Sequence, residues 1–319
     1  MLKTKEELRN LYDNQLKSAL LSIEGERMLL KKKYIRGLIG LLLPLAALLI
    51  FQDYLSFLHI TIAFLIVAPS LYYLIQLDSK KKAYRAKFKK NVVSHIVKLI
   101  NPDWDYQSDS KISSTDFDAS RLFPDRWDKY NGDDFVSGRI DKTDFQFSEL
   151  NVERKVRTRD NKTEWQTVFK GLFAYADFNK EIQGQTFVFP EVTSKLLKVL
   201  SGGFGVKRDG LELIKLENPE FEKRFMVYGS NQIESRYVIT PAMMVAMLSI
   251  DKNQPNPIHF SFVGSRVYIA MSFGLDLFEP RIFSSGLKFE DMEQMNEQFR
   301  IIQTIVEEMN LNTRIWTKD

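Results

Sequence analysis

Two apolar segments between residues 35 and 77 constrain this chain more than any other feature. Residues 35–51 carry one charge, Arg36, and residues 54–77 carry none. The hydrocarbon core of a bilayer takes about 20 apolar residues in a helix, because each residue rises about 1.5 Å. The second segment meets this length, and the first reaches it if Lys33 and Arg36 extend their charges to the interface. We therefore predict two transmembrane helices joined by a turn at Asp53.

Two other interpretations of the apolar block are weaker. A cleaved signal peptide does not fit, because about 34 charged and helix-prone residues precede the block. A buried helical hairpin in a soluble protein remains the alternative. Pro44 and Pro69 lie inside the two segments and predict kinks, which transmembrane helices tolerate.

Charge is distributed unevenly about the apolar block. The net charge is +3 over residues 1–34, +7 over residues 78–100 and −6 over residues 101–319. Cytoplasmic flanks of membrane helices carry an excess of lysine and arginine. We therefore expect both ends of the chain in the cytoplasm and a small tip outside. The acidic remainder argues against nucleic acid as a partner, because phosphate binding needs a basic surface.

A dense basic run follows the second apolar segment. Such a run next to a bilayer attracts anionic lipid, at about 1 kcal/mol per residue. It can equally serve as a topology anchor with a solvated helix face. The candidate lipid-facing residues are Lys80, Lys81, Lys82, Arg85, Lys87, Lys89 and Lys90.

Helical stripes flank the membrane block on both sides. The apolar spacing of three to four residues is typical of a single helix face. Since both flanks leave the same side of the membrane, we expect the stripes to pack as an antiparallel continuation of the hairpin. The stripes are Leu8, Tyr12, Leu16, Leu20 and Ile23 before the block, and Tyr84, Phe88, Val92, Ile96 and Leu99 after it.

From Asn101-Pro102 onward the apolar period changes to two, which is typical of strands. The predicted strands are residues 135–140, 144–157, 164–178, 186–189, 211–216, 224–228, 258–263 and 266–271. Turn residues predict hairpins at 159–162 and 263–266. Pro241 starts a short apolar helix whose Met243, Met244 and Met247 we interpret as core residues, and residues 290–311 form a last amphipathic helix.

These elements predict an α+β fold with a largely antiparallel sheet. A small β-barrel capped by the last helix is the alternative. The predicted organisation is an N-terminal stalk helix over 1–34, a transmembrane hairpin over 35–77, a basic juxtamembrane helix over 78–100 and a soluble domain over 101–319.

No residue pattern predicts a catalytic centre. The chain has no cysteine and three distant histidines, which excludes disulfides and thiolate zinc sites. The glycine-rich residues 201–205 lack the ending of a phosphate-binding loop. An acidic cluster matches no calcium-loop template, so we favour solvated turns over a metal site; it comprises Asp133, Asp134, Asp141, Asp144 and Glu149. We expect no catalytic residue, no metal and no cofactor.

Three strings of the C-terminal half resemble the DUF3137 family of bacterial membrane proteins. They are residues 169–191, 216–244 and 276–280, the last reading DLFEP. The resemblance implies a bacterial inner membrane and no assigned activity. Residues of the second string would line a groove; in the structural interpretation that we favour, Glu222, Arg224, Glu234 and Arg236 form internal ion pairs instead. The candidate groove residues are Glu217, Phe221, Glu222, Arg224, Gln232, Glu234, Arg236 and Tyr237.

Our preferred hypothesis is a membrane-anchored cytoplasmic interaction module without catalytic activity. Its partners would be membrane lipids, an unidentified protein or a second copy of the chain. A membrane-tethered metal-dependent hydrolase built on the acidic cluster is one alternative. An accessory subunit of a membrane transport complex is the other, because two helices without charges in the membrane form no pathway alone.

Overall fold

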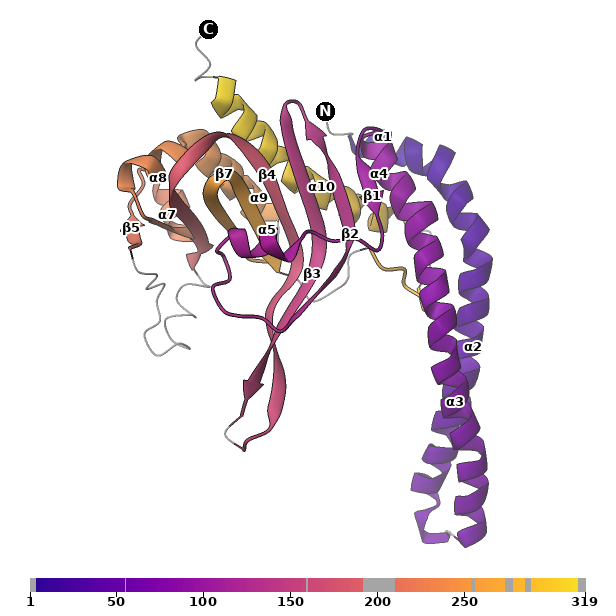
Figure 1. Cartoon of the computed structure of the whole chain (residues 1–319). Helices are drawn as coiled ribbons and strands as arrows, with labels where there is room; N and C mark the ends of the chain where they lie inside the picture. The colour runs from indigo at the N-terminus through magenta and orange to yellow at the C-terminus, as the bar shows by residue number, and fades with distance from the viewer. Residues whose placement is uncertain are drawn as a thin grey trace. The chain divides into compact units, whose positions relative to one another are not determined.

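The computed structural model describes residues 4–54, 56–158, 160–191, 210–253, 256–272, 278–284 and 288–314 (Figure 1). The predicted glycine-rich turn at 201–205 lies outside the described residues. Contacts along the chain divide it into two units. The first comprises Met1–Ile100 and Phe278–Met295, and the second Asn101–Leu277 and Asn296–Asp319.

The first unit is built of helices that continue into one another. Thr4 caps the first helix in a reciprocal pair with Glu7. The elements are α1 (Lys5–Leu11), the π-turn η1 (Tyr12–Leu16), α2 (Lys17–Ile50), the 3₁₀ turn η2 (Gln52–Tyr54), α3 (Phe57–Phe88), the π-turn η3 (Lys89–Val93) and α4 (Ser94–Ile100). Pro44 and Pro69 lie inside α2 and α3, which continue past them.

Two helices of this unit are long and apolar enough to cross a membrane, as the sequence predicted. They contact each other along their length. Glycines allow this approach: a Cβ atom at Gly37 would lie 2.5 Å from Leu74 Cδ2, and one at Gly40 would clash with Ser70 Oγ. Small residues take this role in membrane helix pairs because packing replaces the hydrophobic effect there.

The predicted stripes form the buried seam of the first unit. All five residues of the stripe before the membrane block are buried, and so are Tyr84, Phe88, Val92 and Ile96 after it. Large apolar residues of the membrane block are exposed instead, with 74% of Leu49 and 83% of Phe57 accessible. The buried face therefore belongs to the stalk, and the exposed apolar face belongs to the predicted membrane segments.

The second unit contains an antiparallel sheet of seven strands within its described residues. The order is β1-β2-β3-β4-β6-β5, and β7 also pairs with β4. This confirms the α+β prediction. The strands are β1 (Asp105–Gln107), β2 (Lys129–Ile140), β3 (Thr143–Arg157), β4 (Thr163–Pro190), β5 (Glu212–Ile214), β6 (Phe225–Gly229) and β7 (Ile258–Ser272).

In two places, a pair of segments that the sequence predicts as separate strands forms one continuous strand in the structure. Residues 258–263 and 266–271 form one strand, β7, so the predicted hairpin at 263–266 is wrong. Gly264 has φ of +61° and lies opposite Ile182, where β4 also shifts its register. A glycine in the left-handed region can make a bulge as well as a turn. Residues 164–178 and 186–189 likewise form one strand, β4, which pairs with β7 on both sides of the register shift.

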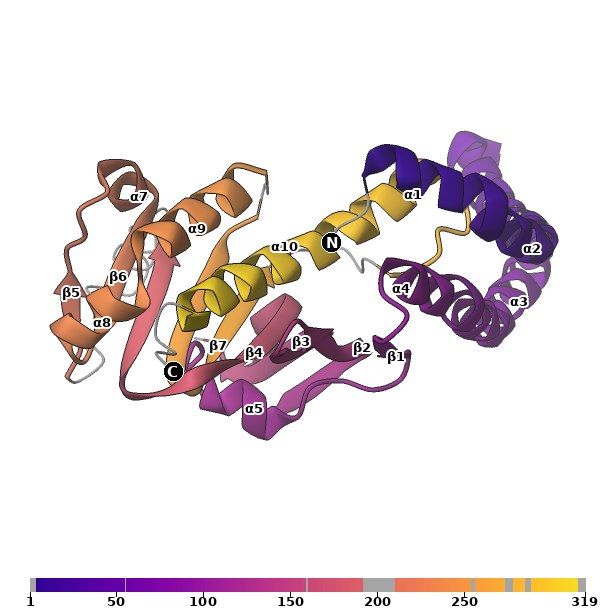
Figure 2. The ribbon, with the colours of Figure 1, turned by 90° about the horizontal axis from the view of Figure 1, so that it is seen from above.

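Helices cover both faces of the sheet (Figure 2). One face carries α5 (Ser114–Ala119), and the other carries α9 (Pro241–Asn253) and the C-terminal part of α10 (Phe289–Arg314). Two short helices, α7 (Pro219–Arg224) and α8 (Gln232–Val238), flank β6 in the sequence. The helices α8 and α9 form a bent pair, at 64°, that is apolar enough to resemble a membrane span. Met243 and Met247 of α9 are fully buried, however, so α9 serves the core, as predicted.

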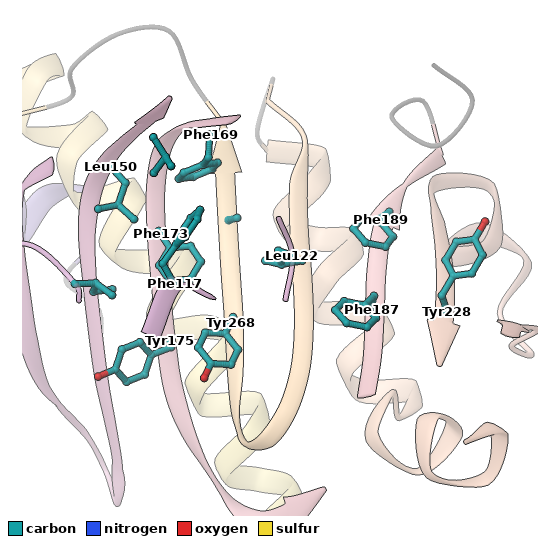
Figure 3. Packing of buried hydrophobic residues seen from close by; sticks show 13 residues of the cluster. Phe117, Leu122, Leu150, Phe169, Phe173, Tyr175, Phe187, Phe189, Tyr228 and Tyr268 are labelled. Carbon is teal, nitrogen blue, oxygen red and sulfur yellow. The ribbon is translucent and has the colours of Figure 1, made fainter. Parts of the chain in front are cut away.

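Aromatic residues fill the core on both sides of the sheet. On the α5 side, Phe117 lies 5.1 Å from Phe173, ring centre to ring centre, and 6.1 Å from Phe169 (Figure 3). On the α10 side, Phe299 lies 5.4 Å from Phe147 and 5.8 Å from Trp104. Each buried phenylalanine contributes about 1.5–3 kcal/mol relative to exposure. Aromatic packing on both faces therefore stabilises the sheet.

Candidate functional site

The basic run after the second membrane segment divides into exposed and buried residues. Lys80, Lys82, Lys87 and Lys90 are exposed, and Lys81 and Arg85 are partly buried. Lys82 pairs with Asp78 at 3.0 Å, and Lys87 pairs with Glu26 of α2. Surface pairs of this kind contribute little to stability.

Lys89 differs from the rest of the run because its side chain is buried. Its ammonium lies 3.1 Å from Glu279, which also pairs with Arg85. Glu279 belongs to the DLFEP string, whose last three residues the structure describes. Arg27 continues this contact: its Nη1 donates to the carbonyl of Ile282 at 2.6 Å. Arg85 and Lys89 thus hold residues 279–282 against the stalk helices of the first unit.

Glu234 of the second family string has a structural task. Its carboxylate accepts hydrogen bonds from the backbone N–H groups of Gln183 and Gly184, at 2.8 and 2.7 Å. These residues lie where β4 shifts register against β7. Two backbone donors that lose their strand partners are thereby satisfied, which matters because orphaned polar groups are costly.

The other charged residues of this string also make internal contacts. Arg224 donates to Asp251 at 2.7 Å, and Glu222 accepts from the N–H of Leu216 at 2.8 Å. Gln232 donates to Glu212 at 2.8 Å and Arg236 to the carbonyl of Lys215 at 3.3 Å. Phe221 is fully buried, Tyr237 is 38% exposed and Glu217 is exposed.

These contacts agree with the internal interpretation, although the partners differ from those expected. The carboxylate of Glu222 lies 3.8 Å from Lys215 Nζ, and Arg224 Nη2 lies 2.5 Å from Asp251 Oδ2. The ion-pair partners Lys215 and Asp251 therefore lie outside the predicted set. The cavity beside Phe221 has a volume of about 40 Å³. That volume holds a water or two and no larger ligand.

Three of the five acidic-cluster residues converge. Carboxylate oxygens of Asp133, Asp134 and Glu149 lie within 4.8 Å of one another. A bulge in β2 between Asp133 and Val136 brings them together, and Asp134 has φ of +56°. Tyr106 donates its hydroxyl to the buried Asp134. Oxygen ligands of this kind suit a hard divalent cation.

The remaining two acidic residues lie apart from this group. Asp141 occupies the β2–β3 turn with φ of +54°. Asp144 pairs with Arg139, whose Nε and Nη2 donate at 2.6 and 2.9 Å. This hydrogen bonding lowers the pKa of Asp144 below its ordinary value. The cluster of five predicted from sequence is therefore a cluster of three.

A pocket of about 780 Å³ lies between the α5–β2 segment and the strands β4 and β6 of the second unit. Its volume falls within the range of small-molecule sites. Sequence reasoning missed it, although the string RLFPDRW at 121–127 interleaves arginines with aromatic residues. The lining consists of Asp118, Arg121, Phe123, Pro124, Asp125, Arg126, Trp127, Gln185, Gly210, Leu211 and Ser230.

A second pocket, of about 660 Å³, provides a contrast in the same unit. Both of its arginines are paired. Arg139 binds Asp144, and Arg266 binds Asp116 at 2.6 Å and Asp177 at 3.2 Å. In the first pocket, neither Arg121 nor Arg126 has a side-chain partner within the part of the chain that the structure describes.

The fold and the apolar helices define a class: a protein with two candidate membrane helices and an antiparallel α+β domain. Residues 167–311 match the family described as Protein of unknown function (DUF3137), so the chain carries a DUF3137 domain, as its strings indicated. No curated protein matches the chain in sequence.

One solved structure is similar to the chain at low identity. It is titled the crystal structure of the mycobacterial trehalose monomycolate transport factor A, TtfA. The two chains are 11% identical, with 62% of this chain and 88% of that chain covered, at a TM-score of 0.29.

Proposed function

We propose that this protein is a membrane-anchored interaction module that binds a protein partner or lipid headgroups through its aqueous part. The observation that carries the proposal is the opposite placement of apolar residues in the two units. The hairpin exposes large side chains such as Leu49, Phe57 and Leu65, whereas the sheet unit buries its aromatic residues. Such a hairpin suits lipid and anchors a domain that folds around its own core.

Charge supports a definite orientation for this anchor. The exposed lysines 80, 82, 87 and 90 follow the second apolar segment, which ends at Leu77, and the turn between the helices carries only Asp53. Positive flanks stay on the cytoplasmic side. The proposal therefore places both chain ends in the cytoplasm of a bacterial inner membrane.

The absence of native cysteine allows a direct test of this orientation. Single cysteines replace Asp53 at the tip, Ser79 after the second membrane segment and Lys142 in the sheet unit. A membrane-impermeant maleimide applied to intact spheroplasts should label Asp53→Cys alone, and lysis should expose the other two. Labelling of Lys142→Cys before lysis would contradict the proposed orientation.

Binding is tested separately by purifying the full chain from its native membrane in mild detergent. Mass spectrometry should find a stoichiometric protein or an enriched lipid, and a transport complex would be identified in the same experiment. A membrane protein of similar abundance, carrying the same tag, controls for nonspecific capture. A chain recovered without companions would contradict the interaction proposal and leave the anchoring result intact.

A second candidate function is a membrane-tethered metal-dependent hydrolase. The convergence of Asp133, Asp134 and Glu149 is the observation that favours it. If it is correct, Mn²⁺ should bind the full chain in isothermal titration calorimetry, and Glu149→Gln should weaken that binding. Asp144→Asn is the matched control, because Asp144 lies outside the group. Equal titrations of the wild type and Glu149→Gln would remove this candidate.

A further inference from the structure

The pocket between the α5–β2 segment and the strands β4 and β6 has an unusual supply of hydrogen-bond donors. Arg121 and Arg126 both line it and are exposed to solvent. Within the described residues their guanidinium groups contact no carboxylate and no carbonyl. Arginine forms a planar fork that matches phosphate and carboxylate oxygens, so two free forks in one pocket are suited to an anion.

The acidic residues of the pocket are already engaged. Asp118 accepts a hydrogen bond from the indole Nε1–H of Trp127 at 2.9 Å. Asp125 pairs with Arg154, from outside the pocket lining, at 2.7 Å. With Arg154 included, the pocket and its immediate partner carry three arginines against two carboxylates. The contacts thus leave the two lining arginines available to a ligand.

Arg121 occupies a backbone conformation that disfavours it. Its φ is +53°, in the left-handed region, which costs a non-glycine residue about 1–2 kcal/mol. The turn is fixed by buried contacts: Ser120 Oγ accepts from the N–H of Leu122, and the Ser120 carbonyl accepts from Ser261 Oγ at 2.7 Å. Glycine would fit this position more easily, so the chain carries an arginine side chain here at a local conformational cost.

The apolar wall of the pocket is held rigidly. Phe123 stacks on Phe117 with ring centres 5.2 Å apart and planes 3° apart. Trp127 contacts Tyr130 at 5.2 Å, and its orientation is set by the hydrogen bond to Asp118. Ser230 accepts from the N–H of Gln185, which leaves its hydroxyl hydrogen free to point toward a ligand. An ordered wall of this kind lowers the entropic cost of binding.

We propose that this pocket binds a phosphate ester, with the phosphate between Arg121 and Arg126 and the organic part against Phe123 and Trp127. The inference deepens the proposed function and rests on it for the presence of a nearby bilayer. The same chemistry occurs in a lipid headgroup and in a soluble phosphate ester. The experiment therefore distinguishes these two sources.

The test uses the full chain in nanodiscs of phosphatidylcholine. Glycerol 3-phosphate, added in solution, probes the soluble source by isothermal titration calorimetry. Vesicles containing phosphatidylglycerol, compared with phosphatidylcholine alone, probe the lipid source by flotation with detergent-solubilised chain. We expect saturable binding of at least one probe, weakened about tenfold in both Arg121→Gly and Arg126→Gln.

Arg121→Gly separates a ligand-binding role from a structural one. Because glycine suits a positive φ, this variant should unfold at the same temperature as the wild type or higher, while its binding is weakened about tenfold. Arg157→Gln is the matched control: it removes an exposed arginine outside the pocket and should bind both probes normally.

The outcomes are distinguishable from a failure of the proposed function. Loss of soluble or vesicle binding in both pocket variants, and not in the control, supports the inference and names the source. Vesicle binding that survives in both variants, with glycerol 3-phosphate binding also unchanged or absent, would place lipid contact elsewhere, such as the exposed lysines after the second membrane segment, and overturn it. Absence of binding to either probe also overturns it, while a co-purifying partner would still support an interaction module.

Discussion

The two units use the same apolar residue types in opposite ways. In the sheet unit Phe147, Phe173 and Phe187 are fully buried, whereas in the hairpin Leu65 is 71% exposed and Phe57 is 83% exposed. The sheet unit gains stability by removing apolar surface from water. The membrane helices have no such gain over lipid and rely on close packing at Gly37 and Gly40. The stability of the sheet unit and that of the hairpin therefore depend on different physical interactions.

The largest expected difference comes from truncating one side chain in each unit. Phe173→Ala should lower the free energy of unfolding by about 3–5 kcal/mol, because Phe173 is enclosed by aromatic rings of α5 and the sheet. Leu65→Ala, in α3, should change it by about 0.5 kcal/mol or less in detergent. Denaturant titrations of both variants measure this. Equal losses would show that the hairpin has a buried core of its own.

Acid should weaken the sheet unit, which is the second unit, through His259, a partly buried histidine whose Nδ1 is buried. Burial lowers the pKa of His259 to about 4, against the raising effect of a hydrogen bond with Ala270. An unfolded histidine titrates near 6.5. As the pH falls from about 6.5 to 4, the unfolded chain takes up a proton that the folded chain refuses. This residue's contribution to stability is therefore present above pH 6.5 and falls by on the order of 3 kcal/mol across that window.

The measurement is the unfolding temperature between pH 7 and pH 4 for the wild type and His259→Leu. The leucine variant should lose less stability as the pH falls, whatever its stability at pH 7. Carboxylates titrate in the same range and are common to both chains, so the difference between them isolates His259. Parallel curves would show that the imidazole is not held neutral.

Two glycines of α2 sharpen the comparison in opposite directions. Gly40→Leu should destabilise the hairpin by about 1–3 kcal/mol, because its side chain would meet Ser70 of α3. Gly25→Ala should stabilise the same helix by about 0.5–1 kcal/mol, since no atom lies within 4 Å of an added Cβ. Unfolding in increasing SDS, followed by helicity, measures both. A harmless Gly40→Leu would mean that the helices do not approach closely in a membrane.

The smallest effect is expected at the sheet surface. Asp144→Asn removes the pair with Arg139, whose side chains are 55% and 62% exposed. Exposed pairs contribute little, so the unfolding temperature should change by no more than about 2 °C at physiological salt. A larger shift, measured by calorimetry, would show that this turn of β2 and β3 is coupled to the core.

The sequence predicts the membrane helices and the stalk well because their signals are local. Twenty apolar residues or a stripe such as Leu8, Tyr12 and Leu16 is visible within one window. The strand β7 shows the limit: Gly264 and Ser265 suggest a turn, and only the long pairing of β7 with β4 makes them a bulge. A local pattern does not specify a partner that lies about 90 residues away along the chain.

The candidate sites were harder to predict for the same reason. Asp133, Asp134 and Glu149 meet because β2 and β3 pair with a bulge, whereas Asp144 lies beyond their reach. The pocket of Arg121 and Arg126 joins a loop to residues near 185, 210 and 230, which no spacing rule connects. Glu234 resembles a groove residue by sequence, yet it satisfies two backbone donors of β4.

The contact between Arg27 and Ile282 has a consequence for the order of events during synthesis. The two residues are 255 positions apart, and ribosomes add about 5–20 residues per second. The helices α2 and α3 are synthesised, and can enter the membrane, roughly 10–40 s before Glu279 and Ile282 exist. During that interval Arg27, Arg85 and Lys89 lack the contacts with Glu279 and Ile282 that they have in the finished fold. The nascent chain thus passes through a stage in which the insertion machinery or a chaperone meets two apolar helices whose stalk end is still incomplete.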